Sequence, residues 1–514
     1  MSCHEEVTTA SPSQQSTERP IPDEEPSKEQ SASTTRSLAF ALPCAVVIFA
    51  LLISGHKSSL RPVAESSIPQ QPHEPPTANE TTCYATCRLR VAESIPMGLV
   101  FGPPALSTYE AWAQLIKTAS KDVVIAAYKS SLQGKHVLGQ ELSEIYSHEG
   151  DSIYALLRKR GEGASNVSIS MVENYPPKDK GDNEDGMLLQ EEGSVNRRYL
   201  TIANIMKRGK MHSKFLLADS KTFYLGSANL DWRSLNQKFE LGVFVEDCPC
   251  LGEDLRRIYD AYWMLSYGFT PAEIRSTPAL YNAESPMRIA INEEPSAVYI
   301  ASSPPALNNE GRTHDLVAVL NTINSAKQFL YFHVMDYFPL FVYRKPQEHW
   351  PLIDDAIRAA ILRGVEVKIL TAALHYPRQI ASFLRSLQAL DKATGHVSVE
   401  AKIMKVPAPE GATIVIARER RTHKKLLVTE DTVVIGNSNW SGDYFEGGTT
   451  GAAVIIQQNG EKKQLVAEMK ANFQRDFNSI YAHPVEEYYN KCIIDHSADF
   501  CETKKDPSLF ADKH

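Results

Sequence analysis

Two short segments, far apart in the chain, each place a histidine two residues before a lysine and seven residues before a carboxylate: His212, Lys214 and Asp219, and then His423, Lys425 and Glu430. Because side chains alternate between the faces of a strand, each histidine and its lysine are expected to project from the same face. If the two segments meet, one site holds two imidazoles and two ammonium groups. That set suits phosphodiester cleavage, because one neutral imidazole can attack phosphorus while the other, protonated, gives its proton to the leaving oxygen.

The residues around each segment add donors for a phosphate group. Each segment opens an apolar run and is followed by a glycine turn that ends in asparagine, at 226–229 and 436–439. Lys214 and Lys425 are cations that can hold phosphate oxygens without a metal. The predicted supporting residues are Ser227, Asn229, Asn439 and Glu240.

The roles within the two segments are assigned as follows. We take His212 as the nucleophile and His423 as the acid, although the reverse assignment is nearly as well supported because the segments match. Asp219 and Glu430 are expected either to orient an imidazole or to neutralise a lysine. A metal is disfavoured, since each segment supplies too few ligands and its lysine repels a cation. No metal and no other cofactor is therefore predicted.

The two segments lie inside an internal repeat in which strand patterns alternate with helix patterns. The predicted strands are 123–126, 167–170 and 241–245 in the first half and 329–332, 365–370 and 452–456 in the second; the predicted helices are 107–119, 152–160, 251–265, 313–325, 350–363 and 461–477. Such alternation predicts an α/β fold with helices on both faces of a sheet. We predict a tandem duplication with repeats at 83–280 and 281–514 and a pseudo-two-fold site between them. Residues 174–198 interrupt the pattern and are predicted to form a surface loop.

The composition restricts the class of substrate. The chain has 514 residues, of which 43% are hydrophobic, and a net charge of −8. Such an acidic chain binds nucleic acid poorly without specific contacts, so any phosphate affinity must be local. Basic clusters do precede both segments: Lys207, Arg208 and Lys210, and then Arg418, Arg420 and Arg421. Their position favours an anionic substrate.

The N-terminal part is predicted to anchor the protein in a membrane. Residues 38–55 are uncharged and mostly apolar, long enough to span a bilayer. Residues 1–37 are rich in Ser, Thr, Pro and Glu, and are interpreted as a cytoplasmic disordered tail. Residues 56–82 are rich in proline and are interpreted as a lumenal stalk. No clear cleavage site follows, so a signal anchor is favoured over a removed signal peptide.

Sequons and cysteines place the bulk of the chain in the lumen. Asn79 and Asn166 begin glycosylation sequons, and a third sequon at Asn439 is expected to be buried and unmodified. The close-spaced pairs Cys83/Cys87 and Cys248/Cys250 are typical of disulfides in an oxidising compartment. A four-cysteine zinc site is the alternative, although Cys-x-Cys is tight for tetrahedral ligation. The role of Cys492 and Cys501 is left open.

The paired segments resemble the signature of the phospholipase D superfamily, His-x-Lys-x4-Asp-x6-Gly-Ser-x-Asn. The first copy matches it throughout. The second copy carries Glu430 for the aspartate, its glycine comes one residue early, and Asn437 replaces the serine. These departures, together with the stretches 226–235, 350–355 and 436–445, resemble the phospholipase D3/D4 branch over about residues 83–490.

The resemblance implies a type II membrane protein of the endoplasmic reticulum, Golgi and endolysosome. It implies a 5′-exonuclease that acts on single-stranded DNA and RNA through a phosphohistidine, with both halves of the site supplied by one chain. It also implies disulfides between Cys83 and Cys250 and between Cys87 and Cys248.

Other functions remain open at the level of sequence. A lipid transphosphatidylase would use the same site with an alcohol as the acceptor, and an inactive membrane-tethered scaffold is a third hypothesis. Stacking aromatics would favour nucleic acid over lipid, and the aromatic residues considered are Tyr128, Tyr337, Trp232, Trp440, Tyr444 and Phe445. The partners considered are therefore single-stranded nucleic acid, phospholipid, and a second copy of the chain as a homodimer.

Overall fold

The structure is a computed structural model that describes residues 86–163, 166–179, 181–291, 293–372, 376–393 and 395–496. The predicted tail, anchor and stalk, and also Asn79, Cys83 and Cys501, lie outside the described residues. Within these ranges no helix combines the length and the apolar character that a bilayer span needs. Asn166 is exposed, whereas Asn439 is buried as expected.

The first half forms a mixed α/β sheet. Its strands lie in the order β1 (Arg88–Ser94), β9 (Lys238–Glu246), β7 (Thr222–Gly226), β6 (Phe215–Ala218), β2 (Asp122–Ala127), β4 (Ser168–Asn174) and β5 (Asn196–Leu200). The main helices are α2 (Thr108–Thr118), α5 (His148–Gly161), α6 (Glu184–Glu191) and α9 (Pro249–Ser266). Strands β2, β4 and β5 are parallel, because helices connect them, while β6, β7 and β9 are joined antiparallel.

The second half repeats this order of strands. Its sheet runs β10 (Met287–Ile291), β11 (Glu294–Ser303), β20 (Gly451–Gln458), β19 (Thr432–Gly436), β18 (Lys425–Thr429), β12 (Phe329–Val334), β15 (Glu366–Thr371), β16 (Val399–Met404) and β21 (Ala482–Pro484). Its main helices are α11 (Asp315–Ser325), α12 (Leu352–Leu362), α13 (Pro377–Gln388) and α16 (Gln464–Phe477). Each predicted strand and helix of both halves corresponds to an element of this list, within a few residues at the ends.

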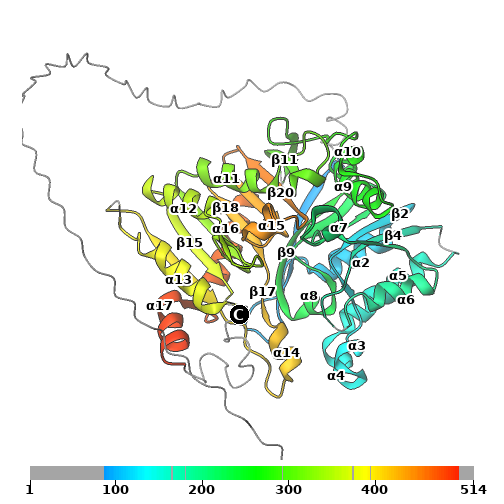
Figure 1. The fold of residues 1–514 in the computed structure, drawn as a ribbon, viewed down its shortest axis with the longest axis horizontal. Coiled ribbons are helices and arrows are strands. Elements are labelled where there is room, and N and C mark those ends of the chain that lie inside the picture. Colours follow the sequence, from blue (N-terminus) through cyan, green and yellow to red (C-terminus); the bar gives the residue numbers. More distant parts are fainter. Residues whose placement is uncertain are drawn as a thin grey trace, which may run out of the picture. The chain divides into compact units, whose positions relative to one another are not determined.

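A shared hydrophobic core joins the two sheets. Alternate residues of β6 and β7, such as Phe215 and Leu225, belong to the same buried cluster as Leu426 of β18 and Ile435 of β19. Strand β17 (Arg421–Thr422), from the second half, also pairs with β9 of the first half, and Figure 1 shows these two strands next to each other. The two halves are therefore continuous where the paired motifs lie.

The interpretation of residues 174–198 as a surface loop was wrong. The segment contains α6 and the start of β5. Leu189 is fully buried in the core of the first half, and the Asp185 carboxylate accepts a hydrogen bond from the Gln133 backbone N–H. The charged and proline-rich start of the segment hid a short helix in which Leu189 is buried, Leu188 is half-buried and Met187 is exposed.

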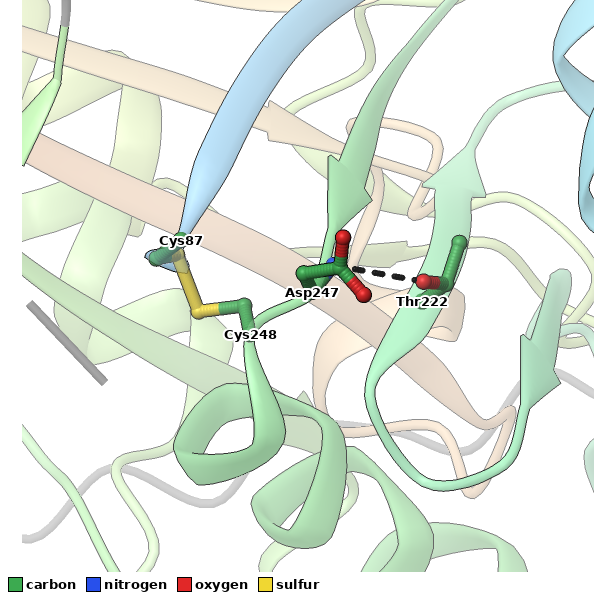
Figure 2. The surroundings of a disulfide bond; sticks show 4 residues. All are labelled: Cys87, Thr222, Asp247 and Cys248. Atoms are coloured by element: carbon green, nitrogen blue, oxygen red, sulfur yellow. Dashed lines mark hydrogen bonds between the residues drawn. A yellow bond between two sulfur atoms is a disulfide. The ribbon is translucent and has the colours of Figure 1, made fainter. Parts of the chain in front are cut away.

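A disulfide between Cys87 and Cys248 ties the residue before β1 to the residue before α9 (Figure 2). This is the pairing that the resemblance implied, and it rules out a zinc site made of all four cysteines. Cys250 and Cys492 are also disulfide-bonded. The implied partner of Cys250, Cys83, lies outside the described residues.

Candidate active site

The first motif lies in an extended segment that runs into β6. The backbone N–H of Met211 donates to Asn174 Oδ1 at 3.0 Å, and the backbone N–H of His212 donates to Thr450 Oγ1 at 3.0 Å. Thr450 belongs to the second half, immediately before β20. The first histidine is therefore held in place by the other half of the molecule.

The second motif is held by the first half in return. His423 lies between β17 and β18, and its backbone N–H donates to the carbonyl oxygen of Phe239 in β9 at 2.8 Å. Thr422, the residue before it, pairs with Phe239 in the β17–β9 ladder. These exchanged contacts bring the two motifs into one site, as the sequence predicted.

Both histidines precede their strands instead of lying within them. In each motif the lysine ammonium group donates back to the histidine carbonyl: Lys214 Nζ to His212 O at 2.5 Å, and Lys425 Nζ to His423 O at 2.8 Å. All four side chains are buried. The two motifs thus have matching local geometry, which fixes the ammonium groups beside the imidazoles.

Glu240 of β9 orients only one of the two imidazoles. Its Oε2 lies 2.7 Å from His423 Nδ1. The same carboxylate accepts hydrogen bonds from Ser227 Oγ at 2.5 Å and Ser234 Oγ at 2.8 Å. A carboxylate on Nδ1 holds the proton there and leaves Nε2 of His423 as the free base.

In the part of the chain that the structure describes, His212 has no counterpart of Glu240. Gly226 pairs with Gly242, and at the matching place in the second half Gly436 pairs with Ala453. Two residues before these partners lie Glu240 and Gly451, so Gly451 holds in the second half the position of Glu240 in the first. A Cβ atom added at Gly451 would lie 2.0 Å from Ser438 Oγ, so the neighbouring side chains leave no room for a side chain there. Consistently, His212 Nδ1 is buried without a hydrogen-bond partner among the described residues. The two motifs therefore have the same local geometry, but within the described residues only the imidazole of His423 is hydrogen-bonded to a carboxylate.

The site is electrostatically positive. Burial, and then the ammonium groups of Lys214 and Lys425, hold the pKa of His212 well below its usual value. Burial and the Lys425 ammonium likewise lower the pKa of His423, and burial lowers the pKa of Lys425 itself to about 7. The positive charges of the ammonium groups disfavour protonation of the two imidazoles. A bound anion would offset these charges, so the site is suited to a phosphate.

In the described part of the chain, the asparagines that end the two glycine turns carry unpaired side-chain oxygens. Asn229 and Asn439 are buried, and the Oδ1 atom of each has no hydrogen-bond partner among the described residues. Asn437, which replaces the serine of the first copy, instead accepts a hydrogen bond from the Ala452 backbone N–H through its Oδ1. It therefore positions the turn, whereas Ser227 at the matching place in the first copy donates to the Glu240 carboxylate.

The expectation for Asp219 and Glu430 needs correction. Asp219 accepts hydrogen bonds from the backbone N–H groups of residues 120–122, and Glu430 accepts from those of residues 327–328. Burial raises the pKa of Asp219, but these backbone donors outweigh it and hold that pKa below its usual value. Five residues of strand separate each carboxylate from its lysine, about 16 Å, so both fix turns at the far ends of β6 and β18.

Two of the six predicted aromatic residues contact the site. The rings of Tyr128 and Tyr444 each lie with their centroids 4.9 Å from that of His212. The other four, Tyr337, Trp232, Trp440 and Phe445, are buried in hydrophobic clusters.

Asp336 is a site residue that the sequence reasoning missed. It lies two residues after Val334, which pairs with Lys425. In the first half Ala126 pairs with Phe215, the residue after Lys214, so Lys129 holds the matching position after β2. It is buried, and its Oδ1 has no partner in the part of the chain that the structure describes. Burial raises the pKa of Asp336 to about 6, against the charges of Lys425 and Arg421. Only comparison of the two repeats by strand register could have drawn attention to it.

Comparisons with known proteins agree with this geometry. The "5′-3′ exonuclease PLD3" of Xenopus tropicalis is 38% identical over 431 residues, which cover 80% of this chain and 84% of that protein. The protein of that name from Homo sapiens is 37% identical over 423 residues, with 80% and 83% covered. The crystal structure of phosphatidylserine synthase from Haemophilus influenzae superposes with a TM-score of 0.51 at 13% identity, covering 76% of this chain and 92% of that one, which shows a common fold.

The family model described as "PLD3/4, PLD-like domain" matches residues 101–409, well over half of the chain. The paired motifs, the repeated strand order and the identity to these relatives all lead to one conclusion: the chain belongs to the PLD3/4, PLD-like domain family.

Proposed function

We propose that this protein is a phosphodiesterase that degrades single-stranded DNA or RNA from the 5′ end through a phosphohistidine intermediate. The observation that carries the proposal is the exchange between the halves, which places both His-Lys motifs in one buried, positive site. The relatives named 5′-3′ exonuclease support the direction of degradation.

The support of the imidazoles suggests a revised assignment of roles. Glu240 fixes the proton of His423 on Nδ1, so Nε2 of His423 can attack phosphorus, and the carboxylate stabilises the positive charge that develops on the ring. His212, whose Nδ1 has no such partner within the described ranges, gives its proton to the leaving oxygen and then takes one from the attacking water. Lys214 and Lys425 hold the non-bridging oxygens. This arrangement reverses the assignment favoured from the sequence.

The rate is expected to depend on pH with an optimum on the acid side of neutrality. Because the pKa of His212 is lowered, its acidic form is lost as the pH rises, and protonation of His423 removes the nucleophile as the pH falls. A plot of kcat/KM against pH should therefore be bell-shaped, with apparent pKa values that belong to the pair. A rate that stays constant from acid to alkaline pH would contradict the two-histidine mechanism.

A labelled single-stranded oligonucleotide tests the proposed function directly. The wild-type protein should shorten a strand with a free 5′ end and leave a strand with a blocked 5′ end intact, while His423→Ala should shorten neither. Trimming that persists in the variant would refute the mechanism. A wild-type protein that trims no strand, but transfers the phosphatidyl group of a phospholipid to an alcohol, would identify the substrate as lipid instead.

We further propose that the two halves arose by tandem duplication about a pseudo-two-fold axis, and that the protein is a type II membrane protein of the endoplasmic reticulum, Golgi and endolysosome. The repeated strand order supports the duplication. The Cys87–Cys248 disulfide and the exposed sequon at Asn166 support a lumenal, glycosylated catalytic part. Loss of the glycan on mutation of Asn166 would appear as increased mobility on a denaturing gel, and unchanged mobility would contradict this topology or the use of that site.

A further inference from the structure

An exposed pair of tyrosines lies at the same sheet edge as the catalytic residues. Tyr175 follows β4 and Tyr199 lies near the end of β5; their ring centroids are 5.0 Å apart, and they are 48% and 44% exposed. The carboxyl ends of the parallel strands β2, β4 and β5 share one edge. Lys214 lies at that edge too, because β6 runs antiparallel to β2.

A buried ion pair fixes the Tyr199 ring in place. The guanidinium carbon of Arg197 lies 4.1 Å from the ring centroid, and Arg197 Nη1 donates to the tyrosine hydroxyl at 2.7 Å. Arg197 Nε donates in turn to Glu173 Oε2 at 2.6 Å, and both of these side chains are buried. A ring that is fixed in advance loses little conformational entropy when a ligand stacks on it.

A series of contacts connects the tyrosine pair with His212. Asn174, the residue before Tyr175, accepts the hydrogen bond from the Met211 backbone N–H, directly before His212. The ring of Tyr128, which contacts His212, also lies near the Lys210 ammonium group, 5.9 Å from the ring centroid. The aromatic pair is therefore linked to the catalytic histidine through the hydrogen bond between Met211 and Asn174, the neighbours of His212 and Tyr175.

Two exposed lysines lie in the segments that carry the tyrosine pair and the first motif. Lys178 comes three residues after Tyr175, and both Lys178 and Lys210 are exposed. Burial, and then the Lys178 ammonium, lower the pKa of Lys210, so the two positive charges repel each other, while the nearby carboxylates of Asp179 and Asp182 partly offset this effect. An anion between them would relieve that repulsion.

We infer that Tyr175, Tyr199, Lys178 and Lys210 bind the part of a single strand that lies beyond the scissile phosphate, with a base stacked on the tyrosines and phosphates on the lysines. This inference rests on the proposed function and identifies the surface that would bind the nucleic acid next to the catalytic site. Aromatic platforms beside cations bind single strands without regard to sequence. Three strand spacings from β6 to β5 amount to about 14 Å, so only a substrate with several nucleotides beyond the cleaved bond reaches the pair.

The test compares a long and a short substrate of the full-length protein. For Tyr175→Ala/Tyr199→Ala we expect kcat/KM on a strand of about 12 nucleotides to fall about 10-fold or more, the loss of one stacked base. Cleavage of a dinucleotide, which cannot reach the tyrosines, should be unchanged. Tyr175→Phe/Tyr199→Phe keeps both rings and should restore cleavage of the long strand.

Tyr267 provides a matched control. It is 56% exposed and its ring centroid lies 3.4 Å from the guanidinium of Arg198, the neighbour of Arg197 in β5, so it forms a similar pair on the opposite face of that strand. Tyr267→Ala should leave both substrates unaffected. An equal loss on the long and short substrates, no loss on the long one, or the same loss in Tyr267→Ala would overturn the inference.

Melting temperatures of all variants distinguish a lost contact from a lost fold, and the dinucleotide rate reports on the catalytic centre independently. If the wild type cleaves neither substrate, the proposed function fails and the inference falls with it. If the wild type trims both substrates and the alanine variants match it, the inference alone is refuted.

Discussion

In His212→Ala, a covalent phosphohistidine is expected to accumulate on His423 when the substrate is a phosphodiester with a nitrophenolate leaving group. Such a leaving group departs without a proton, so the missing acid does not prevent attack by His423 Nε2. Hydrolysis of the intermediate still needs a base for the incoming water, which His212 would supply. Intact-mass measurement of the quenched protein should show the added phosphoryl group together with its remaining ester substituent, and turnover should fall about 10²–10⁴-fold.

In His423→Ala the same substrate should give no covalent adduct. Glu240→Gln should still form the adduct but about 10–100-fold more slowly, since the amide supports the imidazole less well than a carboxylate. His396→Ala removes an exposed histidine and serves as the control. An adduct that appears in His423→Ala and is absent in His212→Ala would restore the assignment favoured from the sequence.

Lys424→Met is expected to cause a large loss of stability. The Lys424 side chain is fully buried, and its ammonium group donates to Glu93, to Asp476 Oδ2 at 2.6 Å and to Asn472 Oδ1 at 2.9 Å. Glu93 belongs to the first half, so this lysine links the halves directly behind the catalytic motif. Without it, two buried carboxylates lose a positive partner, which costs about 3–5 kcal/mol of unfolding free energy.

Urea unfolding followed by fluorescence would measure this loss. Lys117→Met, at an exposed position of α2, should change the unfolding free energy by less than about 0.5 kcal/mol. Adding Asp476→Asn to Lys424→Met should recover part of the stability, because it removes one of the two unbalanced charges. A single variant Lys424→Met as stable as the wild type would show that Arg475, which also donates to Glu93, is sufficient to balance these charges.

The pattern of apolar residues predicted most of the fold because it determines which elements form. The strands at 123–126 and 452–456 and the helix at 251–265 all lie inside β2, β20 and α9. Periodicity also explains why the histidine and lysine of each motif act together. It failed at residues 174–198, where a short helix has too few apolar residues to show a period.

The support of the site was not predictable, because it depends on pairing across long stretches of chain. Glu240 reaches His423 over 183 residues of sequence, and its absence opposite His212 follows from the close approach of Ser438 to Gly451. By contrast, the error over Asp219 could have been avoided. Five residues of extended chain carry it away from Lys214, and spacing along a strand is known from the sequence.

The residue between the histidine and the lysine has a structural role, although the family signature allows any residue at that position. In the first copy Ser213 bonds to Tyr262 and Thr450, and in the second copy Lys424 joins Glu93 and Asp476. Both side chains point away from the catalytic pair and fasten it to the other elements. Because side chains alternate along an extended segment, the catalytic side chains lie on one face and the side chains that hold the segment in place lie on the other.

The Cys87–Cys248 bond also affects how the protein would survive proteolysis. The two cysteines are separated by 161 positions, and everything between them, His212 included, forms a covalently closed ring. A protease that nicks the exposed turn around Lys178 would open this ring without releasing either piece. A singly cut molecule should therefore migrate as one band without reductant and as two bands with it, and it should retain its catalytic histidines on one covalent assembly.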